Sequence, residues 1–269
     1  MQNLLFLKLG GSAITDKTRE STARVDAIKT AARAIKPALD SHSHSHSHST
    51  LNLLLGHGSG SFGHFAAQKS GFGQRGNWRA YAETGAAAAQ LTRIVTDIFI
   101  AAGVPVVAMQ PSASARCRDG ELIELATHPI QTALAHDLVT LVHGDVAFDE
   151  TREMTICSTE MIFAYLAPIL KPSRIILAGI VDGVFTTDPL KDPHARLIPE
   201  ITPANFAQTE SQLRGSHGVD VTGGMMDKVR KMLALVEREP EIQVQIVSVG
   251  MVGRVLLEDR VRAGTLIHA

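Results

Sequence analysis

Three glycine-rich segments with a lysine close by are the parts of this sequence best suited to chemistry. They are KLGGSAITDK at residues 8–17, GSGSFGH at residues 58–64 and DVTGGMMDKVRKM at residues 220–232. Glycines let backbone N–H groups approach an anion closely, and a lysine supplies the positive charge that a phosphate group needs. Lys8 also stands in an otherwise apolar strand, where an ammonium group is costly to bury unless an anion meets it. The three segments therefore predict a phosphate-binding site.

The second segment also fits a different ligand by its spacing. Gly58, Gly60 and Gly63 match the G-x-G-x-x-G pattern of dinucleotide-binding loops, and Glu83 stands 20 residues beyond Gly63, where a ribose-binding acid is expected. In such a site, however, the acid lies at the end of a second strand. Glu83 instead falls within residues 77–99, an alanine-rich stretch with helical spacing, so the sequence disfavours an NAD site. The pattern G-x-x-x-x-G-K-[ST] does not occur, which excludes a P-loop kinase.

The glycine-rich segments stand between stretches whose patterns predict strands and helices. Continuous apolar runs predict strands covered on both faces at residues 4–9, 51–55, 104–109, 138–142, 174–181 and 243–249. Helical spacing predicts helices at about residues 22–39, 79–102, 159–170, 204–214 and 225–238. This alternation predicts a three-layer α/β/α sandwich with a mostly parallel central sheet. Residues 115–125, with the turn signal Asp119-Gly120, and residues 146–156 predict two β-hairpins at the rim.

Composition and charge limit the possible partners. The 269 residues are 45% hydrophobic and 20% charged with a formal net charge of −1, so no overall field would attract nucleic acid or an anionic membrane. Cys117 and Cys157 are too few for a disulfide framework and stand in no zinc-ligand spacing, which favours a reducing compartment. No apolar run approaches the roughly 18 to 20 residues that span a bilayer, and no targeting leader is recognisable. We therefore expect a cytoplasmic protein.

Histidines are numerous, yet their spacing predicts no metal site. Residues 41–49 read SHSHSHSHS, and this alternation predicts a solvated linker with incidental metal affinity. Outside that run, and apart from His64, the histidines match no ligand pattern, so we expect them in turns or on the surface. They are His57, His128, His136, His143, His194, His217 and His268.

Five motifs taken in order carry a resemblance to a known family. KLGGS, GSGSFGH, HGDVAFD, VDGVFTTDP and DVTGGM followed by a lysine resemble the motifs of the amino acid kinase superfamily, from residue 8 to about residue 228. The histidine of GSFGH and Lys17 of ITDK resemble the isopentenyl phosphate kinase family within it. The resemblance implies a single amino acid kinase domain over residues 1–269, with an acceptor-binding lobe at about 1–170 and an ATP-binding lobe at about 171–269. It also implies ATP-dependent phosphorylation of isopentenyl phosphate to the diphosphate, with Mg²⁺, by a homodimer.

The same resemblance implies roles for individual residues. ATP would be bound by Lys8, Leu9, Gly10, Gly11, Ser12, Gly60, Asp182, Gly223, Gly224 and Lys228. The acceptor phosphate would be bound by Ser59, Gly63, His64 and Thr159, where Thr159 replaces a glycine of the family. Catalysis would rest on Lys8, Lys17, His64 and Lys228, with Lys17 stabilising the charge of the group in transfer. Mg²⁺ would bridge ATP oxygens without a dedicated set of protein ligands.

An aromatic segment after His64 is suited to the acceptor's apolar tail. Phe72, Trp78 and Tyr81 stand within ten residues, near the small Gly85, and could form an apolar cavity with aromatic walls. Ordinary helix packing explains the same residues equally well at this point.

Two other functions remain open from the sequence. A fosfomycin-type phosphonate kinase shares the histidine of GSFGH, and a nucleotide-binding regulator could use the same fold without transferring a group. The lysines at positions 8, 17 and 228 favour an enzyme, because a regulator needs no transfer machinery.

Overall fold

The core of the molecule is one large sheet. The computed structural model describes residues 3–43, 51–214, 221–258 and 263–269. Within these residues eight strands form the sheet, and every neighbouring pair is parallel except β13–β14. The order across the sheet is β12 (Glu200–Ile201), β14 (Thr265–Ile267), β13 (Gln243–Ser248), β9 (Arg174–Gly179), β1 (Asn3–Leu9), β2 (Leu51–His57), β6 (Val139–His143) and β3 (Val106–Ala108).

Helices cover both faces of this sheet, as the continuous apolar strands predict. On β1, Phe6 belongs to one hydrophobic core, whereas Leu5 and Leu7 belong to the core on the opposite face. The core of Leu5 and Leu7 is covered by α2 (Val25–Ser43), α4 (Trp78–Ala101) and α9 (Val252–Leu257). The core of Phe6 is covered by α5 (His128–Ala135), α6 (Thr159–Leu170) and α8 (Val221–Arg238). The predicted three-layer α/β/α sandwich with a mostly parallel sheet is therefore confirmed.

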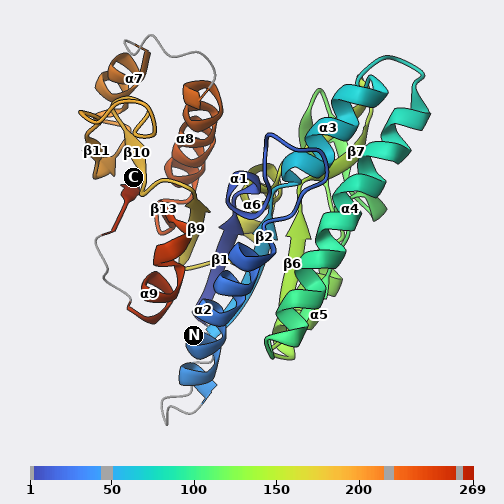
Figure 1. The fold of residues 1–269 in the computed structure, drawn as a ribbon. Helices are drawn as coiled ribbons and strands as arrows, with labels where there is room; N and C mark the ends of the chain where they lie inside the picture. The colour runs from blue at the N-terminus through green and yellow to red at the C-terminus, as the bar shows by residue number, and fades with distance from the viewer. Residues whose placement is uncertain (1–2, 44–50, 215–220, 259–262) are drawn as a thin grey trace.

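The two ends of the sheet carry different parts of the chain. In Figure 1, α4, α5 and α3 (Gly60–Ser70) lie on the right, while α8, α9 and α7 (Phe206–Arg214) lie on the left. β1 and β2 run between these two groups, with α6 and α1 (Gly11–Ile14) near the centre. A small sheet of β10 (Val184–Phe185) and β11 (Leu197–Ile198) lies beside α7.

Both predicted hairpins are present, and they join into one four-stranded sheet. The first is β4 (Arg116–Arg118) with β5 (Glu121–Glu124), and the second is β7 (Asp145–Asp149) with β8 (Glu153–Cys157). The turn of the first hairpin has positive φ at Asp119 (51°) and Gly120 (83°), as a two-residue hairpin turn requires.

One carboxylate ties the two hairpin turns together. Asp149 accepts hydrogen bonds from the backbone N–H groups of Asp119, Gly120, Thr151 and Arg152. Burial opposes the charge, but these backbone donors outweigh it and lower the pKa of Asp149. The second hairpin is therefore held firmly at its tip.

Some elements differ from the sequence-based expectation. α1, α3, α5 and α9 and the short strands β10, β11, β12 and β14 were not predicted, because glycine-rich and short segments carry weak periodicity. α2 continues to Ser43, so the first residues of the Ser-His run are helical rather than part of a linker. Residues 44–49 of that run lie outside the described residues.

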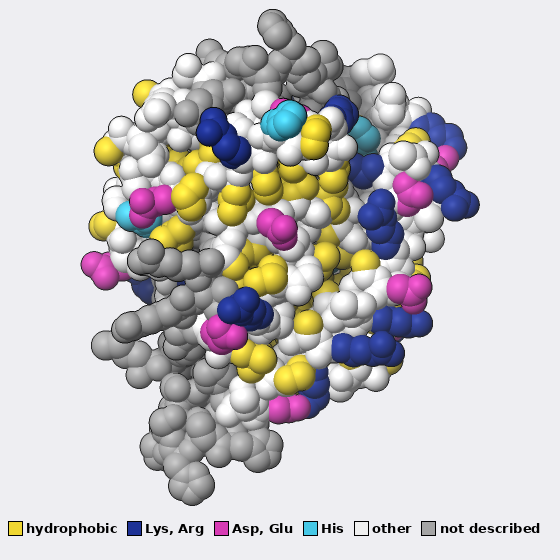
Figure 2. Space-filling model, turned by 60° about the vertical axis from the view of Figure 1, so that its left-hand side comes forward, with side chains coloured by type: hydrophobic (Ala, Val, Ile, Leu, Met, Phe, Trp, Pro, Cys, Tyr) yellow, Lys and Arg dark blue, Asp and Glu magenta, His cyan; other side chains and the backbone are white. Residues whose placement is uncertain are grey.

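The described helices include no candidate for a membrane span, since none is both long and apolar enough. Figure 2 shows one face of the molecule, on which basic and acidic side chains are mixed among apolar ones. That mixture agrees with a formal net charge of −1.

Candidate functional site

Two glycine-rich turns meet at the carboxyl ends of β1 and β2. These strands are parallel neighbours with Lys8 opposite Gly56, so the turns that follow them leave the same edge of the sheet. A Cβ atom on Gly11 would lie only 2.7 Å from the Cα of Gly60, so position 11 has no room for a side chain. Gly60 has φ of +52°, in the left-handed region that favours glycine.

A buried threonine fastens these two turns to each other. The hydroxyl of Thr15 donates to the carbonyl of Gly11 at 2.7 Å and accepts from the backbone N–H of Ser61 at 3.0 Å. The Gly10 N–H donates to Ala178 O at 2.7 Å, so it is directed at β9 and not at an anion. The turns at residues 10–15 and 58–63 therefore form one unit.

Lys8 is buried and has a carboxylate partner. Only 8% of Lys8 is exposed, and its ammonium group forms an ion pair with Glu160 in the first turn of α6. Burial alone would raise the pKa of Glu160, but the positive charges of Lys8 and Lys228 outweigh it and lower the pKa to about 2. Glu160 is therefore ionised at neutral pH. Sequence reasoning missed this residue, and its only signal was an acid at the start of a helix.

Two further lysines are close enough to interact with this pair. Burial lowers the pKa of Lys228 on α8, and the charges of Lys8 and Lys17 lower it further, while Glu160 opposes the shift. Lys17 is exposed in the turn that follows Thr15. Lys8 and Lys228 thus act on one carboxylate and Lys17 acts on Lys228, and the excess positive charge suits a polyanion such as a chain of phosphates.

The other residues predicted to bind ATP come from separate segments of the chain, and their side chains differ in exposure. α8 begins at Val221, so Gly223 and Gly224 lie within its first turn and do not precede the helix as predicted. The N–H groups of a first helical turn have no intrahelical acceptor, so they can still face an anion. Asp182 is exposed in the loop after β9, Leu9 is buried at the end of β1, and Ser12 is partly buried in α1.

Next to the glycine turns, two backbone nitrogens border one small space. A Cβ atom on Gly144 would lie 3.6 Å from Oγ1 of Thr159, 3.7 Å from the nitrogen of Ser59 and 3.8 Å from the nitrogen of Thr159. Ser59 precedes α3, and Thr159 is the first residue of α6. Gly144 stands in the HGDVAFD motif, but the sequence assigned it no role. Gly63 is buried in the first turn of α3, and His64 next to it is exposed.

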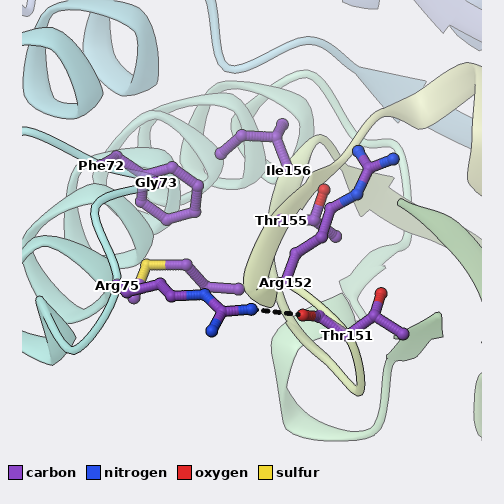
Figure 3. Close-up of a pocket in the computed structure, with 8 residues that line it drawn as sticks. Phe72, Gly73, Arg75, Thr151, Arg152, Thr155 and Ile156 are labelled. Carbon is purple, nitrogen blue, oxygen red and sulfur yellow. Dashed lines mark hydrogen bonds between the residues drawn. The ribbon is translucent and has the colours of Figure 1, made fainter. Parts of the chain in front are cut away.

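An open cavity of mixed polar and apolar lining lies between the loop that joins α3 to α4 and the hairpin of β7 and β8 (Figure 3). Its volume is about 510 Å³, and its lining includes Phe72, Arg75, Arg152, Met154 and Ile156. Figure 3 shows Arg75 reaching across to the hairpin, where its guanidinium donates to the carbonyl of Thr151 at 3.3 Å.

The other predicted aromatic residues contact the same hairpin. Tyr81 stacks on Phe148 with ring centroids 4.6 Å apart, and Trp78 lies 6.1 Å from Phe148. Trp78 and Phe148 remain about half exposed, at 48% and 52%. Burial raises the pKa of Tyr81 to about 12, so its phenol is neutral. Phe72 borders the cavity, and Trp78 and Tyr81 form an apolar wall with the exposed ring of β7.

Two histidines expected in turns or on the surface are instead fully enclosed. His57 ends β2 and His143 ends β6, and their rings stack with centroids 5.5 Å apart. Burial lowers the pKa of His57 to about 3 and that of His143 to about 4. Both rings are therefore neutral at physiological pH. Both are the last residues of buried strands, a position that the sequence alone did not distinguish from a turn.

The sequence of the chain matches known proteins over nearly its whole length. The sequence model of the Amino acid kinase family matches residues 3–248. A curated isopentenyl phosphate kinase of Methanothermobacter thermautotrophicus is 35% identical over 98% of this chain and 98% of its own length. One from Haloferax volcanii is 37% identical over 87% of this chain and 88% of its own. The chain belongs to the amino acid kinase family, and within it to the isopentenyl phosphate kinases.

The fold agrees with this membership. A crystal structure described as isopentenyl phosphate kinase superposes with a TM-score of 0.80 and 31% identity, covering 98% of this chain and 99% of that chain. Among the residues that the structure describes, no group of three or more His, Cys, Asp or Glu side chains could hold a metal ion.

Proposed function

We propose that this protein transfers the γ-phosphoryl group of ATP to isopentenyl phosphate and forms isopentenyl diphosphate and ADP. The observation that carries the proposal is the group of lysines at buried Glu160, where Lys8 and Lys228 act on the carboxylate and Lys17 acts on Lys228. The relatives named isopentenyl phosphate kinase support the choice of acceptor.

The ATP phosphates would occupy the positive region around Lys8, Lys17 and Lys228. The amides of Gly11 and of the first turn of α8 add hydrogen-bond donors there. Asp182, at the carboxyl end of β9, is suitably placed for the nucleoside. We propose that residues 171–269 form the ATP-binding lobe and residues 1–170 the acceptor-binding lobe.

The acceptor phosphate would occupy the space between the nitrogens of Ser59 and Thr159, with His64 donating a further hydrogen bond. The threonine at position 159 keeps a backbone amide where the family has a glycine, and its hydroxyl, which also borders the space, donates to the carbonyl of His57 at 2.7 Å. The tail would then lie along Phe72, Trp78, Tyr81 and the apolar face of the β7–β8 hairpin. The relatives named isopentenyl phosphate kinase, and not this lining, favour isopentenyl phosphate over a small polar phosphonate.

In the reaction, an oxygen of the acceptor phosphate forms a bond to the γ-phosphorus while the bond from that phosphorus to the β–γ bridging oxygen breaks. The acceptor oxygen is already ionised near neutral pH, so no strong general base is needed. The work of the protein is to hold two anions together and to stabilise the transferring group, which three lysines can do. Mg²⁺ bound to ATP would add a Lewis acid that neutralises charge on its phosphate oxygens.

We further propose that the protein acts in the cytoplasm as a homodimer. The free thiols of Cys117 and Cys157 are both buried, in keeping with a reducing compartment. Sedimentation velocity at micromolar concentration tests the dimer, and a monomer across that range would refute it.

The decisive experiment incubates the purified chain with ATP, Mg²⁺ and one acceptor at a time, and follows ³¹P resonances. We expect transfer to isopentenyl phosphate to exceed transfer to fosfomycin, UMP or carbamate. In Lys8→Ala the rate should fall by on the order of 10² or more, because a charge contact to the transferring group is lost. Lys171→Ala is the matched control, since Lys171 forms an exposed pair with Glu239 at 2.7 Å. Preferred phosphorylation of fosfomycin, or no transfer to any acceptor, would refute the proposal.

A further inference from the structure

His57 connects four elements that surround the proposed acceptor-phosphate space. Its carbonyl accepts from the N–H of Gly144 at 3.0 Å and from the hydroxyl of Thr159 at 2.7 Å. Its ring nitrogen Nδ1 lies 3.1 Å from the carbonyl oxygen of Gly58, and Nε2 lies 3.0 Å from Oγ1 of Thr92 on α4. One buried residue at the end of β2 thus contacts the glycine turn, α4, the β6–β7 junction and the start of α6.

The protonation of this ring follows from its partners. The Gly58 carbonyl can only accept, so Nδ1 must carry a proton. A neutral imidazole has one N–H, so Nε2 then faces the Thr92 hydroxyl as an acceptor; the single proton of that hydroxyl is shared between Nε2 and the carbonyl of Ala88 at 3.1 Å. The neutral state is the favoured one, because the ring is enclosed and the second buried imidazole, His143, stacks against it at 5.5 Å.

Two charged groups act on this ring pair in opposite directions. Lys8 acts on His57 from β1 with a positive charge that disfavours a second proton, whereas Asp145 Oδ2 lies 3.5 Å from Nε2 of His143, where a carboxylate favours protonation. Burial outweighs the carboxylate and lowers the pKa of His143 to about 4. Asp145 is itself held by the backbone N–H groups of Ser112 and Val146.

The bond to Gly58 has a geometric consequence for the next amide. In a trans peptide the C=O and the N–H point in opposite directions, and the Gly58–Ser59 peptide is trans. Drawing the Gly58 carbonyl toward the His57 ring therefore turns the Ser59 N–H away from it. Within the described residues the Ser59 N–H has no protein acceptor, and its nitrogen borders the space next to Gly144.

We propose that His57 is a positioning residue for the acceptor: its neutral imidazole holds the Gly58 carbonyl so that the Ser59 amide points at the acceptor phosphate. This inference rests on the proposed function for the identity of the acceptor. It assigns His57 a role distinct from that of His64, because His57 acts through the backbone and does not touch the substrate.

Two substitutions separate the two hydrogen bonds of the ring. In His57→Asn the side-chain amide nitrogen takes the place of Nδ1 and can still donate to Gly58. In His57→Gln the amide nitrogen takes the place of Nε2, so the contact with Thr92 survives and the bond to Gly58 is lost. Thr96→Val is the matched control, because it removes a hydroxyl that donates to the carbonyl of Thr92 on the same helix, away from the ring.

The readout is the KM for isopentenyl phosphate and the KM for ATP, together with the melting temperature. His57→Gln should raise the acceptor KM by about tenfold, as expected for one misdirected hydrogen bond to an anion. The KM for ATP should stay within about twofold, and His57→Asn and Thr96→Val should stay near the wild type in both constants. Equal increases of the acceptor KM in His57→Asn and His57→Gln, in step with equal losses of melting temperature, would overturn the proposal.

A second measurement needs no turnover. Titration with inorganic phosphate, followed by the ¹⁵N–¹H resonance of Ser59, should show binding in the wild type and in His57→Asn. Binding should be about tenfold weaker in His57→Gln. A wild type that binds phosphate at Ser59 but does not phosphorylate isopentenyl phosphate would refute the proposed function and leave this inference standing. An unperturbed Ser59 resonance in a wild type that turns over isopentenyl phosphate would refute the inference alone.

Discussion

Replacing Glu160 with glutamine should destabilise the protein in a pH-dependent way. Glu160 is only 8% exposed and pairs with Lys8, and the charge of Lys228 stabilises it further. Its pKa is lowered from the ordinary value of 4.5 to about 2. Such a shift corresponds to about 3 kcal/mol of folding free energy at neutral pH, in the range measured for breaking a buried ion pair. Glutamine keeps the size of the side chain but leaves Lys8 and Lys228 unneutralised.

The direction of the pH dependence follows from the sign of the shift. The pKa of Glu160 is lower in the folded protein than in the unfolded chain, so its contribution is fully present above about pH 4.5 and is lost as the pH falls through about 2. The difference between wild type and Glu160→Gln should therefore be about 3 kcal/mol at pH 7 and less than half of that at pH 3.

Urea unfolding of both proteins at pH 7, 5, 4 and 3 measures this difference. Glu83→Gln is the matched control, because Glu83 pairs with Arg79 at 2.7 Å on an exposed part of α4. Such a surface pair should contribute less than about 1 kcal/mol. A Glu160→Gln variant as stable as the wild type at pH 7, or a difference that stays constant from pH 7 to pH 3, would refute the electrostatic argument.

Three further predictions concern the acceptor side and the Ser-His run. His64→Ala should slow phosphoryl transfer and leave the affinity for ATP, measured by calorimetry, unchanged. His64→Gln should keep substantial activity with a flatter pH profile. A loss of ATP affinity as large as the loss of rate would contradict the acceptor role. Gly144→Ala should raise the KM for the acceptor by about tenfold, because the added methyl group would occupy the space beside the backbone nitrogens of Ser59 and Thr159. An unchanged KM would exclude that space as the phosphate site. Replacing residues 44–49 with a short polar bridge should leave steady-state rates nearly unchanged, and loss of transfer in a folded variant would show that the run has a role.

The parts of the fold that the sequence predicted are those with strong periodicity. The apolar run at residues 51–55 became β2, and the alanine-rich helix became α4, because each pattern is long enough to determine its own structure. The turn at Asp119-Gly120 was predictable because only a few residue types tolerate positive φ at both central positions. α3 was missed because its sequence GSFGHFAAQKS contains two glycines, which lower helix propensity.

The candidate site was predictable where the chemistry lies in one segment and not where it depends on distant pairs. Lys8 and the two glycine turns were identified from the local sequence of the segments in which they stand. Glu160 is 152 residues from Lys8, and no local pattern indicates that the two side chains meet. His57 and His143 were assigned to turns or the surface because a lone histidine after an apolar run gives no sign of whether the chain continues inside the protein.

The first turn of α6 links the two halves of the proposed reaction. Thr159 borders the acceptor-phosphate space with its backbone nitrogen, and the next residue, Glu160, holds Lys8 beside the proposed ATP phosphates. Ser158 caps this helix by accepting from the N–H of Met161 at 3.2 Å, which fixes where the first turn begins. If consecutive residues of one capped turn serve the two substrates as proposed, a shift of the helix end would move both contacts together. The distance between donor and acceptor would then be set by backbone geometry, which suits a reaction whose main requirement is the positioning of two anions.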